Sequence, residues 1–258
     1  MRRSGLGRAD PGYSSAGRTY NAIDEVWGVA QPGQGRKPDA QWYSKSRDYW
    51  ETTDLTVNGV LGGYESISDV DIGSSRDLIR SLPGLQHSSA IDCGAGIGRV
   101  TEHLLLPLFD HVDMIEQSAA HVEEARRRLA SHPHMRHFVV DGLQSASPPV
   151  SDYDLVWIQW VVGYLTDDDL VAFFDRCASA LRDTDAAYIV VKENVAKGEF
   201  FLDADDNNVT RTMGQFRAIF RRTRDLVLVK TVEQRNFPKE LHGVYSFVLK
   251  RRTHTSRT

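Results

Sequence analysis

The sequence predicts an α/β protein in which a mostly parallel sheet carries helices on both faces. Between residues 90 and 192, short runs rich in β-branched residues alternate with amphipathic segments, which is typical of parallel strands joined by crossover helices. A glycine-rich turn follows the first of these runs, and two further strand-like runs lie beyond residue 192. At 258 residues with 41% apolar content, the chain can bury one sizeable core.

The N-terminal residues are basic and rich in glycine, serine and proline. Because such a composition cannot bury a core, we expect a disordered basic tail over residues 1–39. An organellar presequence is the alternative, although the glycines and prolines would interrupt its amphipathic helix. The folded domain is expected over 40–252, with a helical lid over 40–82 and a short tail over 253–258.

The lid is expected to begin with a helix over Ala40–Glu51, where four aromatic side chains recur at helical spacing and form one face. Residues 58–64 contain three glycines and are predicted to form a loop that lies close to a ligand. A short helix should follow Ser74 or Ser75. The four aromatic residues are Trp42, Tyr43, Tyr49 and Trp50.

Seven strands are predicted, five in the parallel part and two in an antiparallel ribbon at the sheet edge. Ser118 and Thr166 stand where helix N-caps belong. After Lys192 we expect an acidic loop and then a helix near Val209–Thr223. The strands are predicted at Ala90–Cys93, Val112–Glu116, His137–Val140, Asp154–Gln159, Tyr188–Lys192, Leu226–Glu233 and Val244–Leu249.

Composition argues against several classes of function. No apolar run reaches the roughly 18 residues of a membrane span. The net charge of −4 provides no general basic field, so a nucleic-acid partner is not expected. Cys93 and Cys177 form no CxxC pair, which disfavours a structural zinc site and suits a reducing compartment. We expect a cytoplasmic protein, with the nucleus as an additional location.

Two clusters of possible metal ligands have simpler explanations. His132, His134 and His137 lie close together, but Pro133 breaks the helical spacing and no nearby cysteine or carboxylate completes a site. A solvated loop is favoured there. The run that begins at Asp203 lacks the glycine and the glutamate that a calcium loop requires. We therefore expect no metal.

The strongest motif is the segment Asp92–Arg99, which leaves a predicted strand and enters a helix. Its glycines are spaced G-x-G-x-G, whereas a nicotinamide site needs G-x-G-x-x-G and this chain has Arg99 at the last position. The carboxylate of Asp92 would repel a pyrophosphate but suits a cofactor that carries positive charge. S-adenosylmethionine, with its sulfonium and ammonium groups, is such a cofactor.

An acidic residue ends the next predicted strand. Glu116 follows the glycine turn by about 20 residues, where a carboxylate can accept hydrogen bonds from both hydroxyls of a ribose. Gln117 and Ser118 would then border the adenine. The simpler alternative is that Glu116 only ends a strand and the glycines only turn the chain. Agreement between motif, acid and strand order favours the cofactor site.

With these motifs the sequence resembles the class I methyltransferases, and among them the protein N-terminal methyltransferases that recognise Xaa-Pro-Lys termini. The resemblance covers roughly Trp42 to Arg251. It implies a Rossmann-like fold with a seven-stranded sheet, S-adenosylmethionine as methyl donor with S-adenosylhomocysteine as product, and protein N-termini as substrates. The motifs that carry it are Tyr43-Ser44-Lys45, Leu61-Gly62-Gly63-Tyr64, Asp92–Arg99, Leu104–Phe109, Trp157–Val161 and Val244-Tyr245-Ser246-Phe247.

The resemblance also implies roles for single residues. On the cofactor side, Arg99 would contact the methionine carboxylate. On the substrate side, Trp160 would lie against the substrate proline, although core packing is the ordinary role of a tryptophan. Asn194 would hydrogen-bond the N-terminal residue. The cofactor set is Gly94, Arg99, Glu116, Gln117, Ser118, Leu143, Gln144 and Gln159, and the substrate set is Tyr49, Trp50, Leu61, Trp160, Asp203, Asn208 and His242.

Methyl transfer to nitrogen requires a free lone pair, so the amine must first lose its proton. An α-amine with a pKa near 7.7–8.0 is partly neutral at pH 7, whereas a lysine near 10.4 is almost wholly charged. We hypothesise that Asp206 accepts the proton, directly or through water, with Tyr164 as its hydrogen-bonding neighbour. The resembling family often carries histidine where this chain has Tyr164 and tyrosine where it has His242, so histidine-assisted deprotonation is open to question, and His242 then only lines the peptide channel.

Two other functions remain as alternatives. The first is a methyltransferase that acts on a small-molecule amine or on another protein nitrogen, because the glycine turn and Glu116 describe only the cofactor half. The second is a binding module that has lost catalysis. Methylation of nucleic-acid amines is disfavoured because Gln159-Trp160-Val161-Val162 stands where many adenine-N6 enzymes carry an N/D-P-P-Y/F run.

Overall fold

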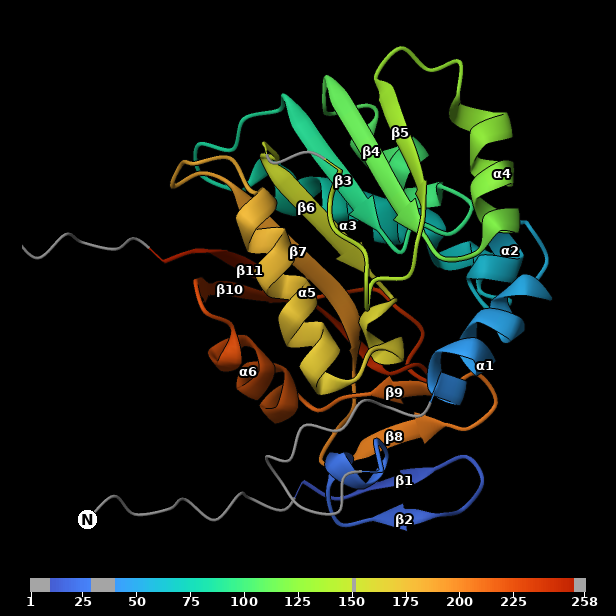
Figure 1. Cartoon of the computed structure of the whole chain (residues 1–258). Coiled ribbons are helices and arrows are strands. Elements are labelled where there is room, and N and C mark those ends of the chain that lie inside the picture. The colour runs from blue at the N-terminus through green and yellow to red at the C-terminus, as the bar shows by residue number, and fades with distance from the viewer. Residues whose placement is uncertain (1–9, 29–39, 150–151, 253–258) are drawn as a thin grey trace, which may run out of the picture.

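The structure, a computed structural model, describes residues 10–28, 40–149 and 152–252. At its centre lies a seven-stranded sheet with the order β10-β11-β7-β6-β3-β4-β5 (Figure 1). Strands β3 to β7 are parallel and β10 and β11 are antiparallel, which confirms the predicted sheet and edge ribbon. The strands are β3 (Ser89–Cys93), β4 (His111–Glu116), β5 (Met135–Val140), β6 (Leu155–Gln159), β7 (Tyr188–Val195), β10 (Leu226–Glu233) and β11 (Gly243–Arg251).

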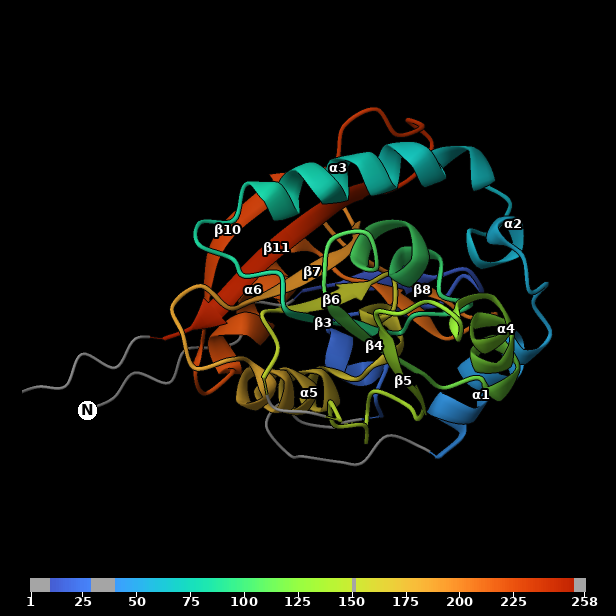
Figure 2. The same ribbon diagram turned by 90° about the horizontal axis from the view of Figure 1, so that it is seen from above.

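Helices cover both faces of this sheet. Figure 2 shows α3 (Ser68–Arg80) over one face and α5 (Asp167–Ala180) over the other, with α6 (Met213–Arg222) on the same side as α5. Helix α4 (Ala119–Leu129) packs against β4 and β5. Each face therefore has its own hydrophobic cluster, and the central strands are buried on both sides, as expected for parallel strands.

The two predicted N-caps are confirmed. The Ser118 hydroxyl accepts a hydrogen bond of 3.3 Å from the backbone N–H of His121 at the start of α4. The Thr166 hydroxyl accepts one of 3.2 Å from the N–H of Asp169 at the start of α5. These caps fix where each helix begins, directly after the end of a strand or of its loop.

The lid region agrees with the prediction in part. Helix α1 (Ala40–Glu51) is confirmed. The segment expected to be a loop contains a single helical turn, α2 (Val57–Val60). Helix α3 begins at Ser68 rather than after Ser74 or Ser75. The predicted start was wrong because Asp71 is fully buried, and a buried polar residue interrupts the apolar period from which a helix is recognised.

Beyond β7 the chain forms a hairpin where an acidic loop was expected. Strand β8 (Phe200–Asp203) turns back into β9 (Asn208–Thr210), and the two are antiparallel. The helix predicted near Val209–Thr223 is correspondingly shorter and begins at Met213. The hairpin belongs to a second sheet with the order β2-β1-β8-β9.

The other two strands of this second sheet contradict the expected disorder of the N-terminal tail. Residues 10–28 contain β1 (Gly12–Ser14) and β2 (Thr19–Tyr20), and β1 pairs with β8 in parallel. Tyr20, Ile23 and Trp27 are buried in a small third hydrophobic cluster. Composition alone indicated disorder because the segment has few apolar residues. Those few are nevertheless buried, because they pack against residues far along the chain. The rest of the predicted tail, residues 1–9 and 29–39, and the predicted tail over 253–258 lie outside the described residues.

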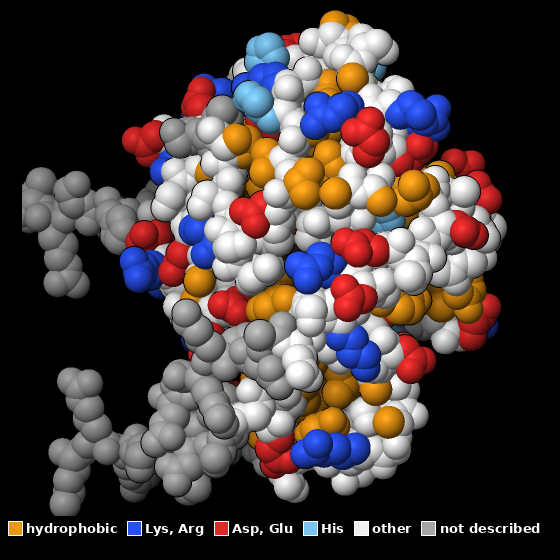
Figure 3. Space-filling view, turned by 45° about the vertical axis from the view of Figure 1, so that its right-hand side comes forward, with side chains coloured by type: hydrophobic (Ala, Val, Ile, Leu, Met, Phe, Trp, Pro, Cys, Tyr) orange, Lys and Arg blue, Asp and Glu red, His pale blue; other side chains and the backbone are white. Residues whose placement is uncertain are grey.

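Surface features agree with the modest net charge. On the face shown in Figure 3, acidic and basic side chains are interspersed. In the part of the chain that the structure describes, no helix has the length and apolarity to cross a membrane.

Candidate active site

A cavity lies beyond the carboxyl ends of β3, β4 and β6, the place where open α/β sheets bind ligands. Its empty volume, which includes space open to solvent, is about 670 Å³. One wall is the glycine turn after β3, and the opposite wall comes from α1, α2 and the loop after β6. The residues predicted from the sequence that line it are Gly94, Arg99, Glu116, Gln117, Gln159, Trp50, Leu61, Trp160 and Tyr164.

The glycine turn presents backbone rather than side chains to the cavity. Gly94 has a φ of 76°, and a Cβ atom there would lie 2.5 Å from the side chain of Val161. The turn is held by the carbonyl of Ile115, which accepts hydrogen bonds from the N–H groups of Gly94 and Ala95 at 2.8 and 3.1 Å. A glycine at position 94 is therefore required both by the backbone conformation and by the close approach of the loop after β6.

Glu116 is held rigidly at the end of β4. Its Oε2 accepts a hydrogen bond of 3.0 Å from the N–H of Gly96, and its Oε1 accepts one of 2.9 Å from the N–H of Ser118. Burial raises the pKa of Glu116, and the backbone donors act in the opposite direction. A carboxylate has about four acceptor sites, so beyond these two donors and the N–H of Gln117 the Glu116 side chain could still accept from a ribose hydroxyl. Ser118 contributes by holding Glu116 and by capping α4.

Asp92 is the second acid of the cavity wall. It is buried, and its Oδ2 accepts a hydrogen bond of 2.7 Å from the hydroxyl of Thr101. Burial raises the pKa of Asp92 to about 6, against the opposing effects of Thr101 and the Arg99 guanidinium. A carboxylate that is costly to ionise in the empty protein can gain from a bound cation.

Beneath the cavity lies a buried polar cluster that the sequence reasoning missed. The fully buried carboxylate of Asp71 accepts hydrogen bonds from Arg99 at 2.8 Å and from the Gln159 amide at 2.8 and 2.9 Å. The Lys192 ammonium lies 2.5 Å from Oδ1 of Asp71. The indole N–H of Trp157 donates to the side-chain oxygen of Gln159 at 2.9 Å. Asp71 therefore sets the positions of two residues predicted to hold the cofactor. Only the buried face of α3 could have indicated it.

Burial also affects the charge of Lys192. It lowers the pKa of Lys192, and the nearby Asp71 carboxylate opposes this effect. Arg99 is itself nearly buried, and its guanidinium lies 5.5 Å from the centre of the Trp160 ring. The cavity wall at Arg99 is thus cationic and backed by one shared carboxylate.

A smaller cavity adjoins the first, with an empty volume of about 330 Å³. Leu143 and Gln144 line it together with Glu116 and Gln117. The structure therefore brings these two predicted cofactor residues to the same end of the site as Glu116.

Trp160 also lines the main cavity and stands immediately after β6. Its φ of 52° is in the left-handed region, which is uncommon for a residue with a large side chain. Its backbone N–H donates to the carbonyl of Lys192 at 3.0 Å. The indole Nε1 is buried and has no hydrogen-bond partner among the described residues. A ligand carbonyl could satisfy this donor.

Tyr164 lines both cavities and contacts Asp206. The Tyr164 hydroxyl donates to Oδ2 of Asp206, and Oδ1 of Asp206 accepts from the N–H of Asn208 at 2.9 Å. Burial raises the pKa of Tyr164 well above its usual value, so the phenol stays protonated and remains a donor. Burial also raises the pKa of Asp206, although the hydrogen bond from Tyr164 lowers it. Asn208 lies against Gly163 in the loop that carries Tyr164.

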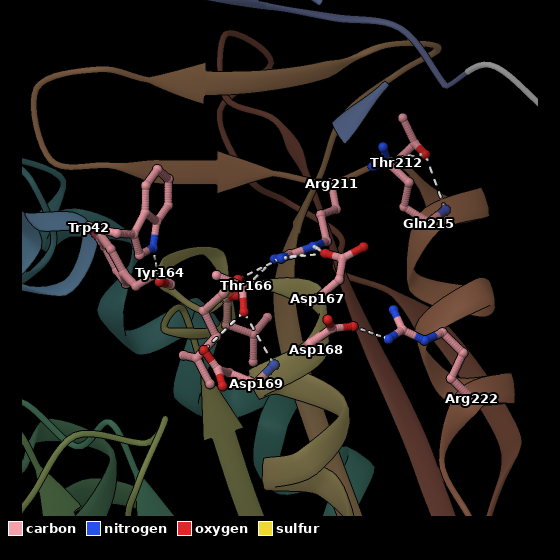
Figure 4. A network of polar contacts seen from close by, with 12 residues as sticks. Trp42, Tyr164, Thr166, Asp167, Asp168, Asp169, Arg211, Thr212, Gln215 and Arg222 are labelled. Atoms are coloured by element: carbon pink, nitrogen blue, oxygen red, sulfur yellow. Dashed lines mark hydrogen bonds and ion pairs between the residues drawn. The ribbon is translucent and has the colours of Figure 1, made fainter. Parts of the chain in front are cut away.

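A polar network fixes the loop behind Tyr164 (Figure 4). The indole N–H of Trp42 on α1 donates to the Tyr164 carbonyl at 2.7 Å. The guanidinium of Arg211, which is fully buried, donates to the carbonyls of Val162 and Leu165 at 2.8 and 2.6 Å. Arg211 also pairs with Asp167 at 2.8 Å. The loop is therefore tied to α1, to α5 and to the segment after β9.

The remaining candidates lie on neighbouring elements. Tyr49 is 43% exposed, and its pKa is raised by burial and by the negative charges of Asp206, Asp203 and Asp205. Oδ1 of Asp203 accepts from the N–H of Asp205 at 3.0 Å, within the hairpin turn. Their roles stay predictions.

The last two candidates come from β7 and from the segment before β11. Asn194 pairs with Val244 in the antiparallel ladder between β7 and β11. The ring of His242 lies 6.2 Å from that of Phe201 on β8, and burial lowers the pKa of His242. Within residues 10–28, 40–149 and 152–252, no group of histidine, cysteine, aspartate or glutamate side chains could hold a metal ion.

Comparison with known proteins bears on this site. Residues 38–250 match the family model described as AdoMet dependent proline di-methyltransferase. The chain is 41% identical over 218 residues to the N-terminal Xaa-Pro-Lys N-methyltransferase 1 of Homo sapiens, an alignment that covers 82% of this chain and 96% of that protein. It is 37% identical over 252 residues to the alpha N-terminal protein methyltransferase 1 of Arabidopsis thaliana, covering 92% and 90% of the two chains.

Solved structures show the same relationship. A SAM-dependent methyltransferase from Leishmania major superposes with a TM-score of 0.86 at 39% identity and covers 94% of this chain and 96% of its own. A phosphoethanolamine N-methyltransferase 1 from Haemonchus contortus has a TM-score of 0.64 at 18% identity, covering 84% of this chain and 50% of its own. The second similarity concerns the fold alone.

Proposed function

Because the chain belongs to the AdoMet dependent proline di-methyltransferase family, we propose that it transfers methyl groups from S-adenosylmethionine to the free α-amino group of protein N-termini. The substrates would begin with Xaa-Pro-Lys or Xaa-Pro-Arg after removal of the initiator methionine. One observation carries the proposal: a single cavity is lined by Gly94 and Glu116 together with Trp160 and Tyr164, and Tyr164 is bonded to Asp206.

Four residues of the cavity lining fit the cofactor, namely Gly94, Glu116, Asp92 and Arg99. The glycine turn leaves room for a ligand against the backbone, and the free lone pairs of Glu116 suit a ribose. Asp92 and Arg99 provide the opposite charges that an ammonium and a carboxylate require. When bound, the cofactor supplies an electrophilic methyl group on a sulfonium.

Trp160, in the same lining, suits a peptide terminus that contains proline. The Trp160 ring offers a flat apolar surface, and extended X-Pro segments bind to such aromatic surfaces with little loss of entropy. Its unpartnered indole N–H can donate to a peptide carbonyl. Asn194 and Asp203 would contact the N-terminal residue and the basic third residue. Tyr49, Trp50 and Leu61 would close the channel against water.

We infer that Asp206, the partner of Tyr164, takes the proton from the substrate amine. A buried carboxylate with a raised pKa is a stronger base than an exposed one, and burial raises the pKa of Asp206. The protonated Tyr164 hydroxyl keeps the carboxylate in one orientation. An α-amine near pKa 7.7–8.0 needs only a weak base at neutral pH, so alignment of the nitrogen contributes most of the acceleration.

The test is incubation of the purified protein with S-adenosylmethionine and a synthetic Xaa-Pro-Lys peptide, followed by mass spectrometry. We expect methylation at the α-nitrogen and none after that amine is acetylated. A peptide with alanine in place of proline is the control for recognition and should react much more slowly. Methylation on the lysine of the blocked peptide would refute the proposal. Faster methylation of free small amines than of the peptide would favour the alternative substrate class.

A further inference from the structure

We propose that the N-terminal segment, residues 10–28, is a working part of the substrate site, because it positions the β8–β9 hairpin and the loop that carries Tyr164. This segment lies outside the 38–250 range that the family model matches. The inference rests on the proposed function, since it concerns how the peptide is held.

Strand β1 holds the hairpin through its backbone. Gly12 and Ser14 pair with Phe200 and Leu202 in the parallel ladder between β1 and β8 (Figure 1). The N–H of Ser15 continues the ladder and donates to the carbonyl of Leu202 at 2.9 Å. Strand β8 thus lies between β1 and β9, and in the part of the chain that the structure describes the N-terminal segment covers the edge that β9 leaves open.

A side-chain contact extends this support into the turn of the hairpin. The hydroxyl of Ser15 accepts a hydrogen bond of 2.9 Å from the N–H of Ala204. Ala204 follows Asp203 directly and stands two residues before Asp206, so the bond fixes the backbone that carries both acids. The turn is also reached from α1, because Lys45 donates to the Ala204 carbonyl.

A second route leads from the segment to Tyr164. The rings of Trp27 and Trp42 pack edge to face, with their centres 4.8 Å apart. Trp42 donates to the Tyr164 carbonyl at 2.7 Å, and its own carbonyl accepts from the side chain of Asn207 at 3.2 Å. Asn207 is the neighbour of Asp206. Both members of the Tyr164–Asp206 pair are therefore reached from residues 10–28.

The stability of the β8–β9 hairpin should depend on the N-terminal segment. An isolated two-stranded hairpin is marginally stable in water, and without β1 and β2 the second sheet would contain only β8 and β9. Phe200, fully buried in the small cluster, packs against Tyr20 with ring centres 5.8 Å apart. Loss of the segment would expose this ring. The predicted cofactor residues lie at the ends of strands of the central sheet or in the segments that follow them, so the effect should concern the peptide and not the cofactor.

Two variants of the full-length chain test the proposal. Gly12→Leu places a side chain where a Cβ would already lie 2.5 Å from the Phe200 ring, which should push β1 away from β8. Ser15→Ala removes only the hydroxyl that holds Ala204, so it retains the fold even if Gly12→Leu does not. Ser131→Ala, the same change at an exposed position in the turn after α4 and outside the segment, is the matched control.

We expect kcat/KM for the Xaa-Pro-Lys peptide to fall about tenfold in Gly12→Leu and about twofold in Ser15→Ala, with the control unchanged. The Kd for S-adenosylhomocysteine, measured by calorimetry, should stay within about twofold of the wild-type value. Hydrogen exchange over residues 200–210 should be faster in Gly12→Leu, which reports directly on the loosened hairpin.

Faster exchange in the hairpin with unchanged peptide kcat/KM would overturn the inference. A parallel loss of S-adenosylhomocysteine affinity would also overturn it, because the segment would then stabilise the whole domain and not the peptide site. Failure of the proposed function is separate: in that case the wild-type chain itself would methylate no Xaa-Pro-Lys peptide, and the inference would fall with it.

Discussion

The hydroxyl of Tyr164 lies 2.9 Å from Oδ2 of Asp206, and this hydrogen bond joins the loop after β6 to the turn of the β8–β9 hairpin. A tyrosine that burial keeps protonated at neutral pH is thus paired with an aspartate whose pKa burial has raised. If Asp206 is the base, the hydrogen bond from Tyr164 affects the pH at which the Asp206 carboxylate is ionised and can accept a proton.

Replacing Asp206 with asparagine should lower kcat for the peptide about 100-fold at pH 7, since a positioned base contributes on that order. Asp205→Asn is the control, because Asp205 is exposed in the same turn and changes the local charge by the same amount. Steady-state kinetics with both variants, beside calorimetric binding of S-adenosylhomocysteine, make the comparison. Equal activity of the two variants with intact binding would exclude Asp206 as the base.

Tyr164→Phe should shift the pH profile of kcat/KM. The hydroxyl lowers the pKa of Asp206 by donating to the carboxylate, so its removal leaves burial less opposed and raises that pKa further. Because the base must be ionised, the acidic limb of the profile should move to higher pH. Rates measured between pH 5 and 9 test this. A limb that stays in place, or moves to lower pH, would contradict the assigned pair.

Asp92→Asn should stabilise the protein while weakening its cofactor site. Burial raises the folded-state pKa of Asp92 from 3.8 to about 6, so the folded state binds the proton more tightly, and stability falls as pH rises through that window. At pH 7 the variant should gain on the order of 1–3 kcal/mol in the free energy of unfolding. The Kd for S-adenosylmethionine should rise at least about tenfold.

Urea unfolding and calorimetry at pH 7 and pH 5 provide the measurements for Asp92→Asn. The gain in stability should shrink at pH 5, where Asp92 of the wild-type protein is largely protonated. Asp69→Asn, at an exposed position of α3, is the matched control. Unchanged affinity for S-adenosylmethionine at pH 7 would show that Asp92 does not face the cation.

Asp71→Asn should destabilise the protein by about 3–5 kcal/mol, because it leaves Arg99 and Lys192 buried without their shared carboxylate. Adding Lys192→Met should restore part of the loss, since it removes one of the two uncompensated charges. Denaturant unfolding of the single and double variants measures the coupling. Additive losses in the double variant would mean that the two side chains do not act as a pair.

The central sheet could be predicted because its strands are short runs rich in apolar and β-branched residues and because the glycine turn and the two caps mark connections between them. Gly94 and Glu116 were identifiable for the same reason, since their spacing along one βαβ unit is a local property. Ser118 and Thr166 were recognisable as caps from sequence alone. The structure places all of these where the pattern indicated.

The second sheet could not be predicted because its pairings join residues far apart in sequence. Gly12 pairs with Phe200, and neither strand is long enough to show a period of its own. Asp71 was missed for a different reason. An acid or a lysine in a sequence indicates a surface, and only the complete fold shows that Asp71 and Lys192 neutralise each other inside the protein.

The backbone of Trp160 has a consequence for selectivity. A left-handed conformation at a bulky residue costs on the order of 1–2 kcal/mol, so it persists only where neighbours enforce it. Here its N–H is tied to Lys192, and the N–H groups of the next two residues act on the carboxylate of Glu193. Because these contacts hold the backbone on both sides of Trp160, the ring cannot move with its backbone to accommodate a residue that does not fit. Discrimination at this wall should therefore depend on rigid shape, with bulky second residues rejected outright.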